Sequence, residues 1–301
     1  MEATAASTRI AIKRILFLTD FSEPSESALS YAMALAREHH AEVHALHVLL
    51  PEPMNYTSPE TTVAAIDAQE EAAQAEMQRT ESMLAGVVYS ASVVRSADMW
   101  PPIERAVEDW GPDLIVLGTH GRTGAKKALL GSVAEMVFRR SPVPVLTVGP
   151  FAREGMHGAA RFHKVLHATD FSPAAMAAAA YAVSLAQESQ AQLVLLHVLA
   201  HDPDSSKVAR GQRSVAQAMH ELFELAPPEV GFWCKPEPVV QYGHPADRIL
   251  EEATGRHADL IVLGVHESGG YPGVAMHLQR SIAYRVIANA RCSVLTVRAT
   301  N

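Results

Sequence analysis

Short apolar runs alternate with longer segments of helical periodicity along the whole chain. The apolar runs of the first half predict strands at residues 14–19, 43–48, 87–94, 114–117 and 145–148. The segments between them predict helices at residues 25–39, 60–84 and 102–110, and a fourth helix that begins at Gly131 and Ser132. Strands that alternate with helices form parallel sheets through right-handed crossovers. The first half is therefore predicted to be an α/β domain.

The second half of the chain repeats the first. The sequence RILFLTDFS at residues 14–22 returns as KVLHATDFS at residues 164–172, and the same offset relates His47 to His197. Such self-similarity predicts a tandem duplication. We assign one domain to residues 1–150 and a second to residues 160–301. Residues 149–162, which contain three glycines and a proline, are the predicted linker.

Composition is typical of an ordinary globular protein and argues against several classes of function. The 301 residues suffice for two domains, and 48% of them are hydrophobic while 19% are charged. The formal net charge of −8 argues against binding to nucleic acids or to anionic membranes. We find no apolar run long enough to span a membrane, no secretory signal pattern and two cysteines without a metal-binding spacing. We therefore expect a cytoplasmic protein that contacts neither nucleic acid nor membrane.

The stretch after the fourth strand carries the strongest chemical signal. Two glycines close the strand, three cations follow, and a glycine-serine pair opens the next helix. These residues are Gly118 and Gly121, then Arg122, Lys126 and Lys127, then Gly131 and Ser132. Ser132 is predicted to be the helix N-cap, and a helix N-terminus offers free N–H groups to an anion. This order favours a polyphosphate site over the alternative, a glycine-rich loop with a solvated basic face.

The spacing matches neither of two common phosphate-binding loops. No glycine immediately precedes Lys126 or Lys127, so the stretch is not a P-loop, and no G-x-G-x-x-G opens a first βαβ unit. The stretch resembles the G-x2-G-x9-G-[S/T] motif of ATP-binding members of the universal stress protein family. The resemblance implies an α/β fold with two tandem, doubly wound, Rossmann-like parallel sheets of five strands in the order 3-2-1-4-5, flanked by helices. It also implies ATP, with or without Mg²⁺, at the strand ends.

Asp20 is a second candidate because it follows the first strand. In the implied order, the first and fourth strands are neighbours, and ligands enter between their carboxyl ends. Asp20 and Gly118 should therefore face one crevice, and the resemblance places this aspartate beside the nucleoside. The alternative role for Asp20 is to cap the following helix. The resemblance thus implies the binding residues Thr19, Asp20, Val48, Gly118, Gly121, Arg122, Lys126, Gly131, Ser132 and Val133.

The second half departs from this set. Glu267 stands where the first half has Gly121, and Arg280 stands where it has Gly131. A carboxylate repels phosphate, and a bulky side chain fills the space that a glycine leaves open. We therefore predict one nucleotide site per chain, in the first half. We expect the second half to bind a smaller anion or no ligand.

Other residues near the predicted site have simpler interpretations. Trp100 either leans on the ligand or packs locally, and packing is the better interpretation. His39, His40, His44 and His47 span a helix end and a strand, where alternation would put His44 and His47 on opposite faces, so we predict no metal site. No G-x-S-x-G elbow or nucleophile–base pair is present, so we assign no catalytic residue.

Three functions stay open at this point. The resemblance favours a tandem universal stress protein in which ATP occupancy sets conformation or partner choice. A slow ATP hydrolase or adenylate-handling enzyme would use the same scaffold, but residues 118–132 carry no carboxylate pair for Mg²⁺ and no evident base. The third possibility is an assembly module that binds no ligand. The glycines and cations retained in the first half argue against it. In each case we expect the fifth strands of the two halves to pair around a local two-fold axis, and we leave a homodimer open.

Overall fold

The computed structural model describes residues 10–51, 59–119, 130–150, 152, 162–199, 213–226, 234, 236–265 and 281–299. These residues belong to two compact units, one built on Ile12–Pro150 and the other on Arg161–Asn301. We call them the first and second units and describe each by itself. No helix among the described residues is both long enough and apolar enough to cross a membrane.

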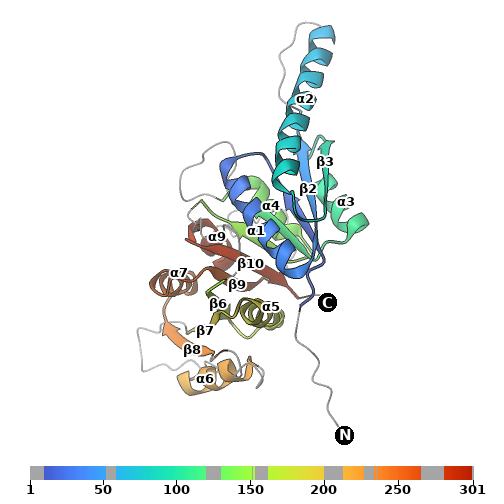
Figure 1. The fold of residues 1–301 in the computed structure, drawn as a ribbon. Coiled ribbons are helices and arrows are strands. Elements are labelled where there is room, and N and C mark those ends of the chain that lie inside the picture. The colour runs from blue at the N-terminus through green and yellow to red at the C-terminus, as the bar shows by residue number, and fades with distance from the viewer. Residues whose placement is uncertain are drawn as a thin grey trace. The chain divides into compact units, whose positions relative to one another are not determined.

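The first unit is a parallel sheet with helices between its strands (Figure 1). Its strands are β1 (Arg14–Leu18), β2 (Glu42–Leu49), β3 (Tyr89–Arg95), β4 (Leu114–Gly118) and β5 (Val145–Val148). Its helices are α1 (Glu23–His39), α2 (Pro59–Met83), α3 (Trp100–Trp110) and α4 (Ser132–Arg140). The strand order is β3-β2-β1-β4-β5, with parallel pairing throughout. This confirms the predicted order and places its reversal between β1 and β4.

The second unit repeats the arrangement. Its strands are β6 (Lys164–Thr169), β7 (Gln192–Leu199), β8 (Glu237–Tyr242), β9 (Leu260–Val265) and β10 (Ser293–Arg298). Its described helices are α5 (Pro173–Ser189), α6 (Val215–Glu224), α7 (Pro245–Gly255) and α9 (Ile282–Asn289). The parallel strands run β8-β7-β6-β9-β10, which is again the order 3-2-1-4-5. The sequence repeat is therefore a repeat of the fold.

The central strands are buried on both faces, as their continuous apolar sequences predict. In β1, Ile15, Leu16 and Phe17 are at most 1% exposed. The long polar helix α2 reaches the core through a narrow stripe of buried side chains spaced four, three and four residues apart. These are Ala73, Met77 and Thr80 in the helix, and Leu84 just beyond it. The rest of the α2 surface is therefore free to carry glutamate and glutamine.

An aspartate at the start of the fourth strand holds the start of the first strand in both units. One carboxylate oxygen of Asp113 accepts the backbone N–H groups of Lys13 and Arg14 at 2.8 and 2.9 Å. In the second unit, Asp259 does the same for the residues that lead into β6, at the same two distances. A charged acceptor strengthens such hydrogen bonds. In each unit these two hydrogen bonds fix the register between the first and fourth strands. They thereby also set the positions of the carboxyl ends of these strands.

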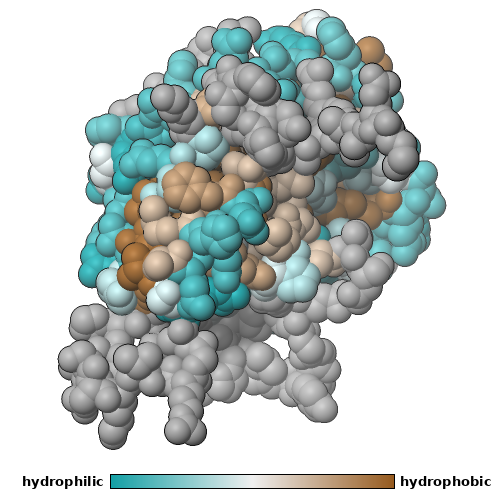
Figure 2. Space-filling view, turned by 90° about the horizontal axis from the view of Figure 1, so that it is seen from below, coloured by the Kyte–Doolittle hydropathy of each residue, from teal (hydrophilic) through white to brown (hydrophobic). Residues whose placement is uncertain are grey.

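Apolar side chains also reach the surface of the second unit. The large exposed ones are Met176, Val215, Phe223, Tyr242 and Ile282. Figure 2 shows one face of the molecule, on which brown apolar atoms lie among teal hydrophilic ones. Scattered apolar side chains are normal on protein surfaces. We therefore assign no interface to them.

Candidate functional site

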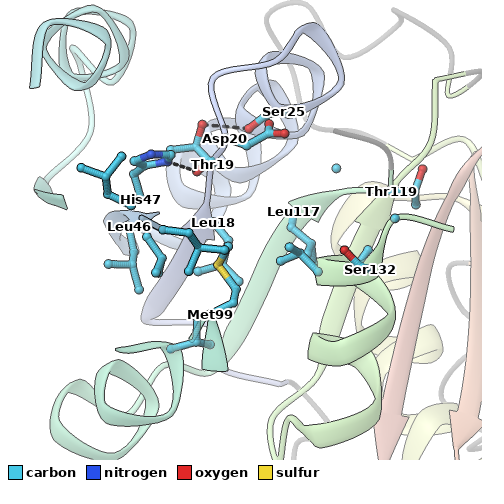
Figure 3. A pocket seen from close by; sticks show the side chains of 18 of the residues that line it. Leu18, Thr19, Asp20, Ser25, Leu46, His47, Met99, Leu117, Thr119 and Ser132 are labelled. Atoms are coloured by element: carbon cyan, nitrogen blue, oxygen red, sulfur yellow. Dashed lines mark hydrogen bonds between the residues drawn. The ribbon is translucent and has the colours of Figure 1, made fainter. Parts of the chain in front are cut away.

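A cavity of about 430 Å³ lies at the carboxyl ends of β1, β2 and β4 in the first unit. Its walls come from the ends of these strands, from the start of α1, from α2 and α3, and from the first turn of α4. Figure 3 shows Asp20 between His47 on one side and Ser132 on the other. The cavity thus occupies the point where the strand order reverses, which is where open α/β sheets receive ligands.

Seven of the ten residues proposed from the sequence line this one cavity. They are Thr19, Asp20, Val48, Gly118, Gly131, Ser132 and Val133. The other three, Gly121, Arg122 and Lys126, lie outside the described residues. The lining also includes residues that the sequence did not single out, namely Ser25, Gln69, Met99, Ile103 and Thr119.

Thr19 and Asp20 form a tight turn between β1 and α1. The Thr19 hydroxyl oxygen accepts the backbone N–H of Phe21 at 3.0 Å and the hydroxyl of Ser25 at 2.9 Å. These bonds hold Phe21 at a φ of 62°, a left-handed conformation that is rare for a bulky residue. The turn directs the chain from the strand end into the helix and leaves Thr19 and Asp20 on the cavity wall.

Asp20 does not cap α1 in the way the sequence alternative supposed. The N-cap is Ser22, and one carboxylate oxygen of Asp20 accepts both the backbone N–H and the hydroxyl of that serine. The carboxylate therefore supports the turn from two residues before the N-cap. Its position on the cavity wall also brings a negative group to the ligand space.

His47 is a structural residue of the site, which the sequence interpretation treated as an ordinary histidine. Its Nδ1 lies 2.8 Å from the carbonyl oxygen of Thr19, so Nδ1 carries the proton and donates. The ring also packs on Phe21, with 4.3 Å between ring centroids. His47 thus supports the turn from β2. The recurrence of Thr-Asp-Phe-Ser at residues 169–172 and of the histidine at position 197 is the sequence signal that could have revealed this role.

Gly118 is required by packing as well as by any ligand. A Cβ atom added to Gly118 would lie 3.0 Å from the backbone carbonyl group of Pro24 and 3.2 Å from the Ser25 nitrogen. These distances are tighter than ordinary van der Waals contacts, so a larger residue would require the first turn of α1 to shift slightly away from the end of β4. The sequence had placed Gly118 in the candidate binding site, and its packing against α1 was not predicted.

The N-terminus of α4 forms the wall opposite His47. Ser132 was predicted to be the N-cap, but the cap is Gly131. Gly131 donates its N–H to the Thr119 carbonyl oxygen at 2.8 Å and has an extended backbone. Its own carbonyl oxygen accepts the backbone N–H of Glu135, so the helix starts one residue earlier than a Ser132 cap would give. A glycine cap has no side chain to occupy the N–H groups of the first turn. This end of the cavity is therefore suited to an anion.

The other end of the cavity is apolar. Leu46 and Leu49 from β2, together with Met99 and Ile103 from the α3 region, line this part of the wall. Trp100 is not among the lining residues. It is 8% exposed and lies under the Arg140 guanidinium, 5.6 Å from its ring centroid. Trp100 therefore packs locally, which is the interpretation that we preferred from the sequence.

His44 lies on the other face of β2 from His47. Its ring nitrogens are 2.8 and 3.0 Å from the hydroxyl oxygens of Ser90 and Ser92, and its ring packs against Trp110. Burial lowers the pKa of His44 below its usual 6.5, with Glu42 opposing the shift. Within the described ranges, no group of three or more His, Cys, Asp or Glu side chains is placed to hold a metal ion.

Fold and cavity together define a tandem α/β protein with a cavity at the switch point of its first unit. The model of the universal stress protein family matches residues 11–149 and again residues 161–298. The chain therefore belongs to the universal stress protein family.

Individual relatives agree with this assignment. A universal stress protein of Mycolicibacterium smegmatis is 26% identical over 298 residues, which cover 94% of this chain and 96% of the relative. A shorter universal stress protein of Methanocaldococcus jannaschii is 30% identical over 155 residues, or 46% of this chain and 96% of the relative. The longer match spans both units, so the tandem arrangement is shared.

Solved structures show the same fold at lower identity. A universal stress protein from Archaeoglobus fulgidus matches with a TM-score of 0.67 and 22% identity, covering 95% of this chain and 98% of that one. A protein of unknown function from Pseudomonas aeruginosa matches with a TM-score of 0.62 and 18% identity, covering 96% and 93%. At these identities the likeness concerns the fold alone.

Proposed function

We propose that this chain is an ATP-binding regulatory protein of the stress response, with one nucleotide site, in the first unit. The observation that carries the proposal is that one cavity combines Asp20 at a strand end with the glycine-capped N-terminus of α4. A helix N-terminus attracts phosphate, and an apolar pocket receives a base. The cavity volume of about 430 Å³ falls in the usual range for small-ligand sites.

In this proposal the phosphates lie at Gly131, Ser132 and Val133, and the base lies at the apolar end of the cavity. The glycine motif, which resembles that of the ATP-binding family members, supports ATP as the nucleotide. Asp20 is the one carboxylate among the described lining residues. Since Mg²⁺ in nucleotide sites keeps several waters and uses phosphate oxygens, a companion Mg²⁺ would rely mainly on the ligand.

The proposed role is regulatory rather than catalytic. ATP occupancy would set the conformation of the first unit or its choice of partner. The proposal includes pairing of the two units through β5 and β10, each the last strand in the order of its own sheet. It also keeps the expected cytoplasmic location, which the free thiols of Cys234 and Cys292 support.

The nucleotide content of the purified protein tests the proposal. The chain would be purified without added nucleotide, denatured, and its released small molecules separated by ion-exchange chromatography. We expect adenine nucleotide at no more than one equivalent per chain, and saturation at one equivalent when ATP is added. Absence of adenine nucleotide both before and after addition of ATP would refute the proposal. Release of one ADP per chain per minute or faster would favour the enzyme alternative.

A further inference from the structure

The wall of the cavity contains a polar side chain with an unused hydrogen-bond acceptor. Gln69 comes from α2 and lines the cavity. Its Nε2 donates to the carbonyl oxygen of Leu50, just beyond β2, at 3.1 Å. Its Oε1 is buried and has no hydrogen-bond partner among the residues that the structure describes.

The orientation of this amide is set by its surroundings. The two ends of a glutamine amide are distinguished by their hydrogen bonds. If the amide were reversed, Oε1 would face the Leu50 carbonyl oxygen, and two acceptors would repel each other. Nε2 must therefore face Leu50, and Oε1 is the amide atom that remains without a hydrogen-bond partner among the described residues. Burying an acceptor without a donor is unfavourable, and most such groups in proteins have a partner.

Gln69 lies at the opposite end of the cavity from the anion site. Its bond to Leu50 places it at the end of β2, whereas the bond from Gly131 to Thr119 places α4 at the end of β4. In the sheet, β1 separates β2 from β4. Two strand spacings amount to roughly 10 Å. A nucleotide with its phosphates at α4 therefore extends its base toward Gln69.

We propose that Gln69 selects the base of the bound nucleotide by accepting a hydrogen bond from an exocyclic amino group, such as the 6-amino group of adenine. This inference rests on the proposed function, because it assumes a nucleotide in the cavity. The last side-chain torsion of glutamine is broad, so rotation about it brings Oε1 toward the ligand, and this rotation exchanges the exposed hydrogen bond from Nε2 to Leu50 for the bond to the ligand. A purine with a 6-oxo group presents an acceptor instead, and it would leave Oε1 facing another oxygen.

The substitution Gln69→Met tests the role of the amide. Methionine is unbranched and similar in length, so it fills the same space without an acceptor. Gln74→Met is the matched control, because Gln74 lies on the same helix with an exposed side chain. Affinities would be measured by calorimetry for ATP, for inosine triphosphate with its 6-oxo group, and for purine riboside triphosphate, which carries hydrogen at position 6.

We expect the parent protein to prefer ATP over both analogues. Gln69→Met should weaken ATP binding by roughly 3- to 10-fold, the value of one buried hydrogen bond. It should leave the affinity for purine riboside triphosphate unchanged, which also shows that the cavity is intact. The control should behave like the parent with all three ligands.

Equal losses for ATP and purine riboside triphosphate would overturn the inference, because Gln69 would then act on the cavity and not on the amino group. A loss that appears with ATP but not with 2′-deoxy-ATP would assign Gln69 to the ribose and overturn it as well. If the parent protein binds none of the nucleotides, the proposed function itself fails and the inference falls with it.

Discussion

The two units share one end of the candidate site and differ at the other. The turn after the first strand is the same in both, since Phe171 has a φ of 61° and His197 donates to the Thr169 carbonyl oxygen at 2.8 Å. The rings of Phe171 and His197 also pack, with centroids 4.7 Å apart. These values nearly equal those of the first unit. This turn is therefore a structural element of the fold and does not by itself indicate a ligand.

The helix at the other end distinguishes the units. In the second unit α9 begins with Ser281 as N-cap, and the serine side chain accepts the backbone N–H of Tyr284 at 3.1 Å. Arg285, in the first turns of α9, pairs with Asp247 at 2.6 Å. The first unit has Gly131 at the cap, without a side-chain acceptor. The cap of α9 thus satisfies one N–H of its first turn, whereas the cap of α4 offers no side-chain acceptor to its first turn. This difference supports the proposal that the phosphates of a nucleotide bind in the first unit.

The largest effect on stability is expected from the glycine that ends the fourth strand. A Cβ atom added to Gly264 would collide directly with the backbone of Ala174 and Ala175, whereas at Gly118 the contact with Pro24 is tight but less severe. We expect Gly264→Ala to cost about 3 kcal/mol or more and Gly118→Ala to cost about 1–2 kcal/mol. Denaturant unfolding of both variants measures the difference. Equal costs would mean that the two helices approach their strands equally closely.

The buried histidine of the second unit makes its stability depend on pH. His167 is fully buried, and its counterpart in the first unit is Phe17. Its Nδ1 lies 3.1 Å from the Val262 carbonyl oxygen, while Nε2 has no partner among the described residues. Burial lowers the pKa of His167 from 6.5 to about 4, against the opposing effects of that hydrogen bond and of Asp170. The folded chain therefore holds this side chain neutral.

Acid should destabilise the second unit through His167. The unfolded chain takes up a proton at the usual pKa of about 6.5, so stability falls as the pH drops below that value and stops falling below about 4. At pH 5 the loss should be about 2 kcal/mol relative to pH 8. His167→Phe should remove this part of the pH dependence, whereas His220→Gln, at an exposed position, should not. An unchanged pH profile in His167→Phe would contradict the assignment.

The smallest effect concerns the two helix caps. Ser281→Ala should cost about 1 kcal/mol, because it removes the side chain that accepts from Tyr284. Ser132→Ala should cost less than about 0.5 kcal/mol, because the cap of α4 is Gly131. Thermal unfolding of the two variants without nucleotide measures both costs. If Ser132→Ala were the more destabilising of the two, Ser132 would cap α4 after all.

The sequence predicted the elements well where their signals are local. Continuous apolar runs located the strands, and β5 was found at residues 145–148 without error. The strand order came from the family resemblance, which rests on a long and specific motif. The error at Ser132 has a local cause, because a glycine and a serine next to each other are both good caps and the hydrogen bond from Gly131 to Thr119 decides between them.

Those site residues that the sequence missed depend on packing between distant elements. Gln69 lies in α2, Ile103 lies in α3 and Met99 is the N-cap of α3. Nothing in their local sequence pattern shows that these residues meet the end of β2. The role of Gly118 was only partly predicted for the same reason. Its neighbours in space, Pro24 and Ser25, are distant in sequence.

Calorimetric titration of the full chain with ATP tests the central claim most directly. Gly131 has a φ of −60°, which any residue adopts, so Gly131→Leu should fold while its side chain fills the space at the helix N-terminus. Gly255→Leu serves as the control, because an added Cβ there meets nothing within 4 Å. We predict one ATP per chain for the parent and the control, and no binding for Gly131→Leu. Two ATP per chain, or parent-like binding by Gly131→Leu, would contradict the claim that the first unit holds the one nucleotide site.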